Sequence, residues 1–104
     1  MRTAISFDRK AIADFCRRHG IKEFSIFGSV LRDDFTADSD VDVLIAFLPD
    51  APRRLMNLLE IEEELQEMLG RRVDVVERRV IEQSRNYLRR AQILGSAEPV
   101  YVEG

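Results

Sequence analysis

The hydrophobic and polar residues change period several times along the chain, and each change marks the limit of a predicted element. Apolar residues at helical spacing predict amphipathic helices over residues 9–19, 53–69 and 80–94. Short apolar runs predict strands over residues 23–27, 40–47 and 73–77, and residues 99–102 fit an edge strand. A helical turn over residues 30–34 and a polar loop over residues 33–39 separate the first two strands. This alternation predicts one α/β domain, in which helices cover a sheet.

Residues suited to helix ends stand at the limits of these segments. Asp8 suits the N-cap of the first helix, because its carboxylate accepts hydrogen bonds from the free N–H groups of the first turn. Gly20 and Gly70 follow the first two helices, where glycine tolerates the left-handed backbone that ends many helices. Pro49 ends the strand over residues 40–47.

The helix faces carry further expectations. One face of the first helix, which should lie against the sheet, holds Ile12, Phe15, Cys16 and His19. We interpret His19 as a cation near the C-terminal end of the helix dipole. The acidic residues of the long helix are expected on its solvated face: Glu60, Glu62, Glu63, Glu64 and Glu67. Tyr87 in the last helix is expected to be packed.

Length and composition set the class of protein. The chain has 104 residues, of which 45% are hydrophobic, so a single domain over residues 1–104 is expected. No apolar run is long enough to span a membrane, and the N-terminal residues lack the apolar core of a signal peptide, so a cytoplasmic location is predicted. A net charge of -3 disfavours direct binding of nucleic acid. With Cys16 and His19 as the only residues of their types, any metal must be held by carboxylates.

Three aspartates are the candidate metal ligands. Asp40 and Asp42 stand at i and i+2 of a predicted strand, so their side chains share one face of the sheet. Asp74 interrupts the apolar strand over residues 73–77, and it joins them if that strand lies beside the strand of Asp40. A carboxylate in an apolar strand needs a partner, either a metal or an arginine. Clustered carboxylates suit Mg²⁺ or Mn²⁺, which leave coordination positions open for substrate phosphates.

A candidate phosphate site precedes the aspartates. Gly28 and Ser29 follow the first predicted strand, and a glycine there lets the backbone come close to a ligand. Backbone N–H groups at a turn into a helix favour an anion. Arg32 can reach a triphosphate at this turn or pair with a nearby acid. Metals on one side and N–H groups on the other would hold a nucleoside triphosphate for in-line displacement.

Each feature also has a simpler structural explanation. A Gly-Ser pair after a strand is usually an ordinary turn, and an Asp-x-Asp pair at the start of a strand is often solvated. The simpler partner for Asp74 is Arg71 or Arg72 instead of a metal. The combination of all three features, in this order and at this spacing, favours a nucleotide-metal site.

The run FGSVLRDDFTADSDVDVLI, residues 27–45, resembles the signature of the nucleotidyltransferase superfamily related to DNA polymerase β. In that signature, Gly-Ser is followed after ten residues by Asp-x-Asp and later by a third aspartate. The chain is most similar to the minimal nucleotidyltransferases, the MNT or MntA-like proteins. The resemblance implies a polymerase β-like domain with a mixed sheet covered by helices. It assigns the divalent cations and catalysis to Asp40, Asp42 and Asp74, and the phosphates to Gly28, Ser29 and Arg32.

The resemblance also implies a partner. Minimal nucleotidyltransferases typically act as antitoxins of a small helical HEPN ribonuclease, and they transfer AMP from ATP to one of its tyrosines. We therefore expect a metal-dependent transferase that modifies a hydroxyl of a HEPN-type protein, within a hetero-oligomer. The alternative is a non-catalytic antitoxin that covers its partner and keeps only a vestigial or regulatory nucleotide site. Transfer to RNA ends or to a small molecule such as an aminoglycoside is disfavoured, because the chain leaves no room for an acceptor-binding domain.

A small domain cannot surround a nucleotide, so part of the site is expected to come from another chain. An apolar contact surface should then be exposed on the last helix or around Val30 and Leu31.

Overall fold

The computed structural model describes residues 8–28, 40–52 and 57–103. The described elements, in chain order, are α1 (Arg9–His19), β1 (Ile21–Phe27), β2 (Val41–Phe47), α2 (Leu58–Leu69), β3 (Val73–Glu77), α3 (Arg78–Glu82), α4 (Tyr87–Ser96) and β4 (Glu98–Val102). Three predicted segments lie outside the described residues: the turn over residues 30–34, the loop over residues 33–39 and the first four residues of the helix over residues 53–69. Asp40, which follows the loop, is described.

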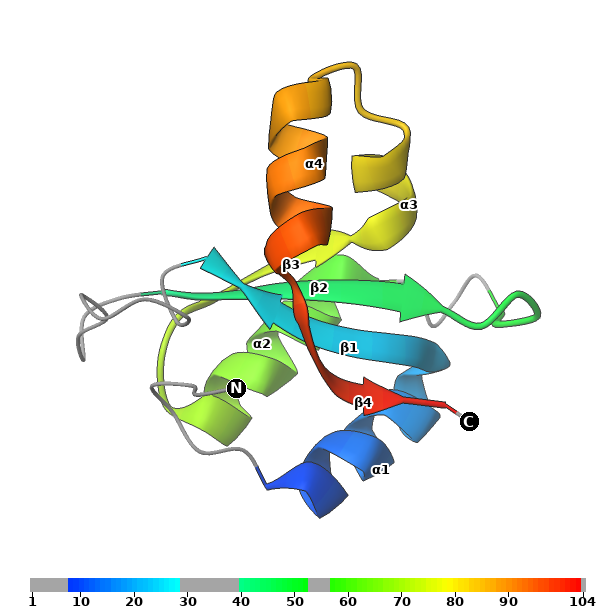
Figure 1. Ribbon diagram of the computed structural model, residues 1–104. Coiled ribbons are helices and arrows are strands. Elements are labelled where there is room, and N and C mark those ends of the chain that lie inside the picture. The colour runs from blue at the N-terminus through cyan, green and yellow to red at the C-terminus, as the bar shows by residue number, and fades with distance from the viewer. Residues whose placement is uncertain (1–7, 29–39, 53–56, 104) are drawn as a thin grey trace.

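The described strands form one mixed sheet in the order β3-β2-β1-β4 (Figure 1). β1 pairs antiparallel with both β2 and β4, whereas β2 and β3 are parallel. The α/β fold with a mixed sheet is therefore confirmed, and so is the edge position of the last strand. No helix in the described ranges is long and apolar enough to cross a membrane.

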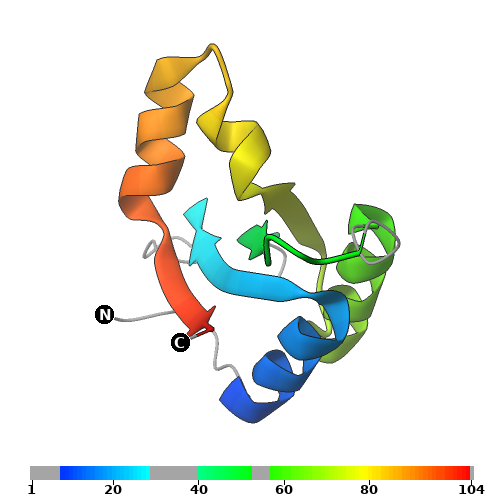
Figure 2. The same ribbon diagram turned by 90° about the vertical axis from the view of Figure 1, so that its right-hand side faces the viewer.

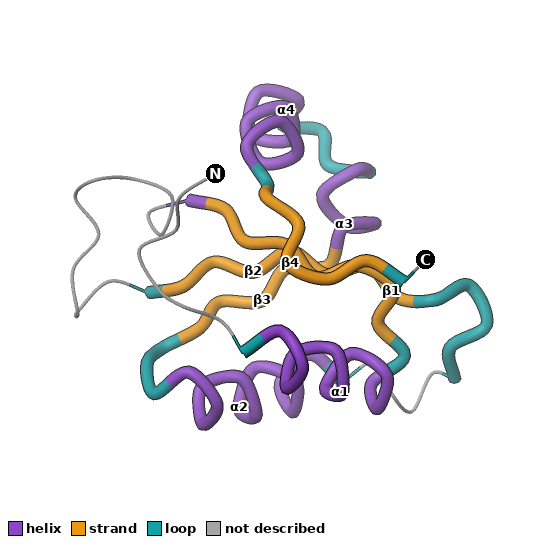
Figure 3. The backbone as a smooth tube through the Cα atoms, turned by 60° about the horizontal axis from the view of Figure 1, so that its bottom comes forward, coloured by secondary structure: helices purple, strands orange, loops and turns teal. Residues whose placement is uncertain are grey.

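Helices cover both faces of the sheet. Figure 2 shows α1 and α2 on one side and α3 and α4 on the other, and Figure 3 shows α1 and α2 side by side. The first side holds the larger core, in which Phe15 of α1 packs with Phe24 of β1 and Leu65 of α2. The second side holds a smaller cluster of buried residues: Phe27, Leu44, Ile81 and Ile93. Because side chains alternate along a strand, each buried strand contributes to both layers.

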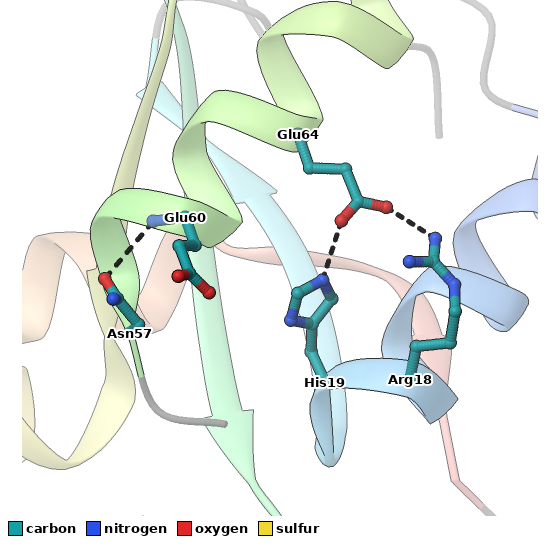
Figure 4. Close-up of polar contacts among 5 residues, drawn as sticks. All are labelled: Arg18, His19, Asn57, Glu60 and Glu64. Atoms are coloured by element: carbon teal, nitrogen blue, oxygen red, sulfur yellow. Dashed lines mark hydrogen bonds and ion pairs between the residues drawn. The ribbon is translucent and has the colours of Figure 1, made fainter. Parts of the chain in front are cut away.

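The helix ends agree with the sequence where both can be compared. The Asp8 carboxylate accepts hydrogen bonds from the backbone N–H groups of Lys10 and Ala11, and Gly20 ends α1 with a left-handed φ of 66°. Gly70 ends α2 in the same way, with φ 68°. The start of α2 was predicted too early, because Asn57 has an extended backbone and its side chain accepts hydrogen bonds from the N–H groups of Leu59 and Glu60. Figure 4 shows the contact with Glu60.

The predicted helix over residues 80–94 is wrong in one respect, because the structure has two helices there. α3 ends at Glu82, and Asn86 then caps α4 by accepting a hydrogen bond from the Arg89 N–H. The Arg90 guanidinium donates to the carbonyls of Glu82 and Ser84, which closes the turn. Side-chain hydrogen bonds of this kind compete with a continuous helix although the apolar spacing is unbroken.

Two glutamates of α2 are not on a solvated face, so that prediction is wrong for them. The Glu62 carboxylate accepts a hydrogen bond from the Val75 N–H of β3 at 3.2 Å. This contact satisfies a backbone donor on the outer edge of the sheet. Glu64 bonds the side chains of both Arg18 and His19, with 2.9 Å between the His19 Nε2 and the carboxylate (Figure 4). The Arg18 hydrogen bond lowers the pKa of the Glu64 carboxyl, and the His19 hydrogen bond adds to this effect.

Candidate functional site

The C-terminal end of β1 and the N-terminal ends of β2 and β3 lie together at one end of the sheet. Phe27 at the end of β1 pairs with Asp42 in the antiparallel register. Asp42 pairs in turn with Asp74 in the parallel register of β2 and β3. Neighbouring strands are only about 4.8 Å apart, so the two aspartates stand side by side. The strand of Asp74 thus lies beside the strand of Asp42, as the three-aspartate hypothesis requires.

Asp42 and Asp74 occupy the α3 and α4 side of the sheet. Two residues further along each strand, Leu44 and Val76 belong to the small apolar cluster on that side. Alternation along a strand therefore places the aspartates on the same face, one step closer to the strand ends. The site lies where this apolar layer stops.

Asp40 is less closely associated with the other two. It precedes β2, and its carboxylate lies 3.4 Å from the Arg72 guanidinium in an exposed ion pair. The adjacent Val41 N–H donates to the Arg72 carbonyl, which continues the pairing of the two strands to this point. Arg72, named as an alternative partner for Asp74, therefore contacts Asp40.

Asp74 lies in the predicted strand but its side chain is exposed, so the expectation that an unpartnered carboxylate is costly there is wrong. The buried residues of β3 are Val73 and Val75, which face the main core, whereas Asp74 points the other way. Its carboxylate can remain hydrated, and no desolvation penalty forces it to find a partner. The argument for Asp74 therefore rests on its position beside Asp42.

Gly28 brings the backbone against the Asp42 carboxylate. Its φ of 78° is in the left-handed region that favours glycine, and a Cβ atom there would overlap the carboxylate, at only 3.2 Å from its carboxyl carbon. The prediction at this glycine was a close approach of the backbone to a ligand, whereas the structure shows a close approach to the Asp42 carboxylate. Ser29 and Arg32, the other predicted phosphate ligands, lie outside the described residues.

An open cavity of about 560 Å³ contains the two aspartates. Its described lining comes from the strand ends and from α4: Phe27, Gly28, Asp42, Asp74, Arg89, Gln92, Ile93 and Ser96. This volume is in the usual range for sites that bind small molecules. The contribution of α4 was not predicted, although Arg89, Gln92 and Ser96 have the helical spacing of a common face.

The donor set fits a hard divalent cation that shares its coordination with a substrate. No group of three His, Cys, Asp or Glu side chains in the described ranges is arranged to enclose a metal ion. Mg²⁺, however, is usually held by one or two carboxylates together with water and substrate phosphates. Asp42 and Asp74, adjacent in an open cavity, meet that requirement.

Comparison with known proteins decides the family. The model of the nucleotidyltransferase domain family matches residues 8–96, which include every aspartate of the site and all of α4. The chain belongs to this nucleotidyltransferase family. The predictions of a nucleotidyltransferase enzyme and of its fold are thereby confirmed, and the match to the minimal group is supported by the relatives.

Two archaeal relatives illustrate the sequence similarity. A protein of Methanocaldococcus jannaschii with the provisional name of a protein adenylyltransferase is 37% identical over 68 residues, which cover 65% of this chain and 71% of the relative. The protein adenylyltransferase MntA of Thermococcus cleftensis is 44% identical over 59 residues, which cover 57% of this chain and 58% of the relative. The chain thus spans less than two thirds of the second relative.

Solved structures show the same fold. One, provisionally named a minimal nucleotidyltransferase, has a TM-score of 0.65 and 34% identity, and the match covers 88% of this chain and 87% of the other. Another is the complex of a tri-AMPylated Shewanella oneidensis HEPN toxin with its MNT antitoxin, with a TM-score of 0.58, 17% identity and coverage of 90% and 69%. At that identity the second match supports the fold alone.

Proposed function

We propose that this nucleotidyltransferase transfers AMP from ATP to a hydroxyl of a HEPN-type partner protein, and that it acts as the antitoxin of that partner in the cytoplasm. The observation that carries this proposal is the pairing of Asp42 with Asp74 in one open cavity, against the backbone of Gly28. Relatives named protein adenylyltransferase support AMP as the transferred group. The solved complex of an AMPylated HEPN toxin with an MNT antitoxin supports the class of partner.

Asp42 and Asp74 would hold Mg²⁺ or Mn²⁺, with Asp40 joining them once it leaves Arg72. The cation would supply charge neutralisation at the phosphates and would orient the triphosphate. Gly28 and Ser29 would bind phosphate oxygens through their backbone N–H groups, and Arg32 would add a positive charge. The pairing of β1 with β2 fixes Asp42 and Gly28 relative to each other. The metal ligand and the phosphate-binding backbone are therefore held by the same two strands.

The transfer is an in-line displacement at the α-phosphorus. The acceptor oxygen bonds to phosphorus as the bond to the bridging oxygen of the β-phosphate breaks, and pyrophosphate leaves with that electron pair. The proton of the acceptor hydroxyl passes to a carboxylate of the site. We assign this role to Asp74, because it lines the cavity and its side chain is exposed, so an acceptor hydroxyl can approach it from solvent.

The α3 and α4 pair offers a surface for the partner. Val80 of α3 and Tyr87 and Leu88 of α4 are 58%, 64% and 71% exposed, and the two helices contact each other. Exposed apolar patches are typical of protein interfaces. The prediction that Tyr87 is packed is thus wrong within this chain, whereas the last helix does expose apolar residues, as expected of a contact surface. Replacing Leu88 with Ser should weaken the complex with a HEPN partner in analytical ultracentrifugation, and an unchanged complex would remove α4 from the interface.

A label on the α-phosphate tests the proposed transfer. The chain is incubated with Mg²⁺, a HEPN-type partner and ATP labelled either at the α- or at the γ-phosphate. AMP transfer places the α-label, and not the γ-label, on the partner protein. The non-catalytic alternative predicts a stable complex with neither label, and transfer of the γ-label would indicate a kinase.

A further inference from the structure

Helix α4 presents a polar face to the cavity, opposite the aspartates of the sheet. Arg89, Gln92 and Ser96 line the cavity at spacings of three and four residues, which place them along one side of the helix. The neighbouring Ile93 is buried against Phe27 and Leu44 and holds this side of α4 against the sheet. The cavity thus lies between the aspartates at the end of the sheet and the polar face of α4.

Arg89 is the only cation among the described residues that line the cavity. The ion pairs formed within the described part of the chain do not include its guanidinium. The adjacent Arg90 has a structural role, because it donates to the carbonyls of Glu82 and Ser84. Arg85, in the turn before α4, does not line the cavity. Of these three arginines, Arg89 alone lines the cavity that contains the aspartates.

The position of Arg89 in the helix is unfavourable for a cation. Asn86 caps α4 and accepts a hydrogen bond from the Arg89 N–H at 3.1 Å, so Arg89 stands in the first turn, which has no acidic residue. The positive end of the helix dipole disfavours a cation there. A bound anion would offset this repulsion. It would also accept hydrogen bonds from the guanidinium, whose planar arrangement of N–H donors matches phosphate oxygens.

We propose that Arg89 binds the β- and γ-phosphates of the nucleoside triphosphate from the α4 side of the cavity. This inference rests on the proposed function and names a further residue of the same site. Negative charge grows on the pyrophosphate as its bond to the α-phosphorus breaks, and the guanidinium stabilises that charge. The metal-binding carboxylates and Arg89 therefore hold the phosphate chain from two sides.

Nucleotide affinities test the inference, with AMP as the comparison because it lacks the β- and γ-phosphates. Dissociation constants for ATP and for AMP, both with Mg²⁺, are measured by calorimetry for the wild type, R89Q, R89K and the surface control R85Q. We expect R89Q to weaken ATP binding about 10- to 100-fold, the range for a lost charge-assisted contact, and to leave AMP binding within about twofold. R89K keeps the charge without the fork and should fall between, and R85Q should match the wild type.

The outcomes separate this inference from the function on which it rests. Wild-type affinity for ATP in R89Q, or an equal loss of ATP and AMP binding, would overturn the role of Arg89 while the transferase proposal stands. A wild-type chain that is folded by circular dichroism and binds neither nucleotide, alone or with its partner, would overturn both. If R89Q does not fold, the same ATP-to-AMP comparison in R89K decides, since an unchanged ratio there contradicts bidentate binding.

Discussion

The backbone of Gly28 lies directly against the carboxylate of Asp42, across the antiparallel pair of β1 and β2. A Cβ atom at Gly28 would overlap that carboxylate, and the left-handed φ of 78° independently requires glycine. The end of one strand is thus fitted to the acidic residue at the start of the next. This contact links the predicted phosphate loop to the predicted metal ligands in a single piece of structure.

The substitution G28A should therefore affect both stability and transfer. The new methyl group forces the Asp42 carboxylate aside, and a displaced catalytic group of this kind lowers the transfer rate by about 100-fold. The matched control is G70A, because Gly70 has a similar φ of 68° with no atom within 4 Å of its Cβ position. G70A should lose only about 1–2 kcal/mol of unfolding free energy and keep its activity.

Denaturant titrations and transfer rates of the two variants decide the point. Equal activity in G28A and G70A would show that the contact with Asp42 has no functional weight.

The contacts of Glu64 predict a dependence of stability on pH. The pKa of Glu64 is lowered in the folded state, mainly by the hydrogen bond from Arg18, so its contribution is present above the unfolded pKa. It is lost as the pH falls through the lower, folded pKa. The exposed guanidinium limits the effect to about 0.2–1 kcal/mol. In E64Q the decline in unfolding free energy between pH 6 and the acid range should be shallower than in the wild type, and parallel curves would contradict this role.

Cys16 should be inert in the folded protein. Burial raises the pKa of its thiol to about 12, so almost no thiolate forms near neutral pH. The thiol should react with a disulfide reagent only after unfolding in denaturant. Rapid reaction of the native chain would show that α1 opens from the sheet.

The positions of the strands along the chain, although not their order in the sheet, could be predicted from the sequence, because alternating and helical spacing of hydrophobic residues differ clearly here. The separation of α3 from α4 could not, since the apolar spacing continues through the break and only the side-chain bonds of Asn86 and Arg90 reveal it. In the site, the position of Asp74 beside Asp42 could be predicted only on the assumption that their two strands are neighbours in the sheet. Arg89 was missed because polar residues at helical spacing also describe a solvated face, and the difference depends on which side of the sheet α4 covers.

The same reasoning explains the exposed position of Asp74. Its apolar neighbours in the sequence imply burial, but alternation along β3 places Val73 and Val75 in the core and Asp74 on the opposite face. A strand that is apolar in sequence can therefore present one carboxylate to an open cavity without a buried charge.

The central claim is AMP transfer by the Asp42 and Asp74 pair, and intact-mass spectrometry of the HEPN-type partner tests it most directly. The partner is incubated with ATP, Mg²⁺ and either the wild type, D42N, D74N or D50N, the last a matched change at an exposed turn residue. We predict that the wild type and D50N add AMP units to the partner, and that D42N and D74N reduce the rate by roughly 100-fold or more. The account would be contradicted by undiminished transfer in D42N, or by an unmodified partner in a stable complex with the wild type.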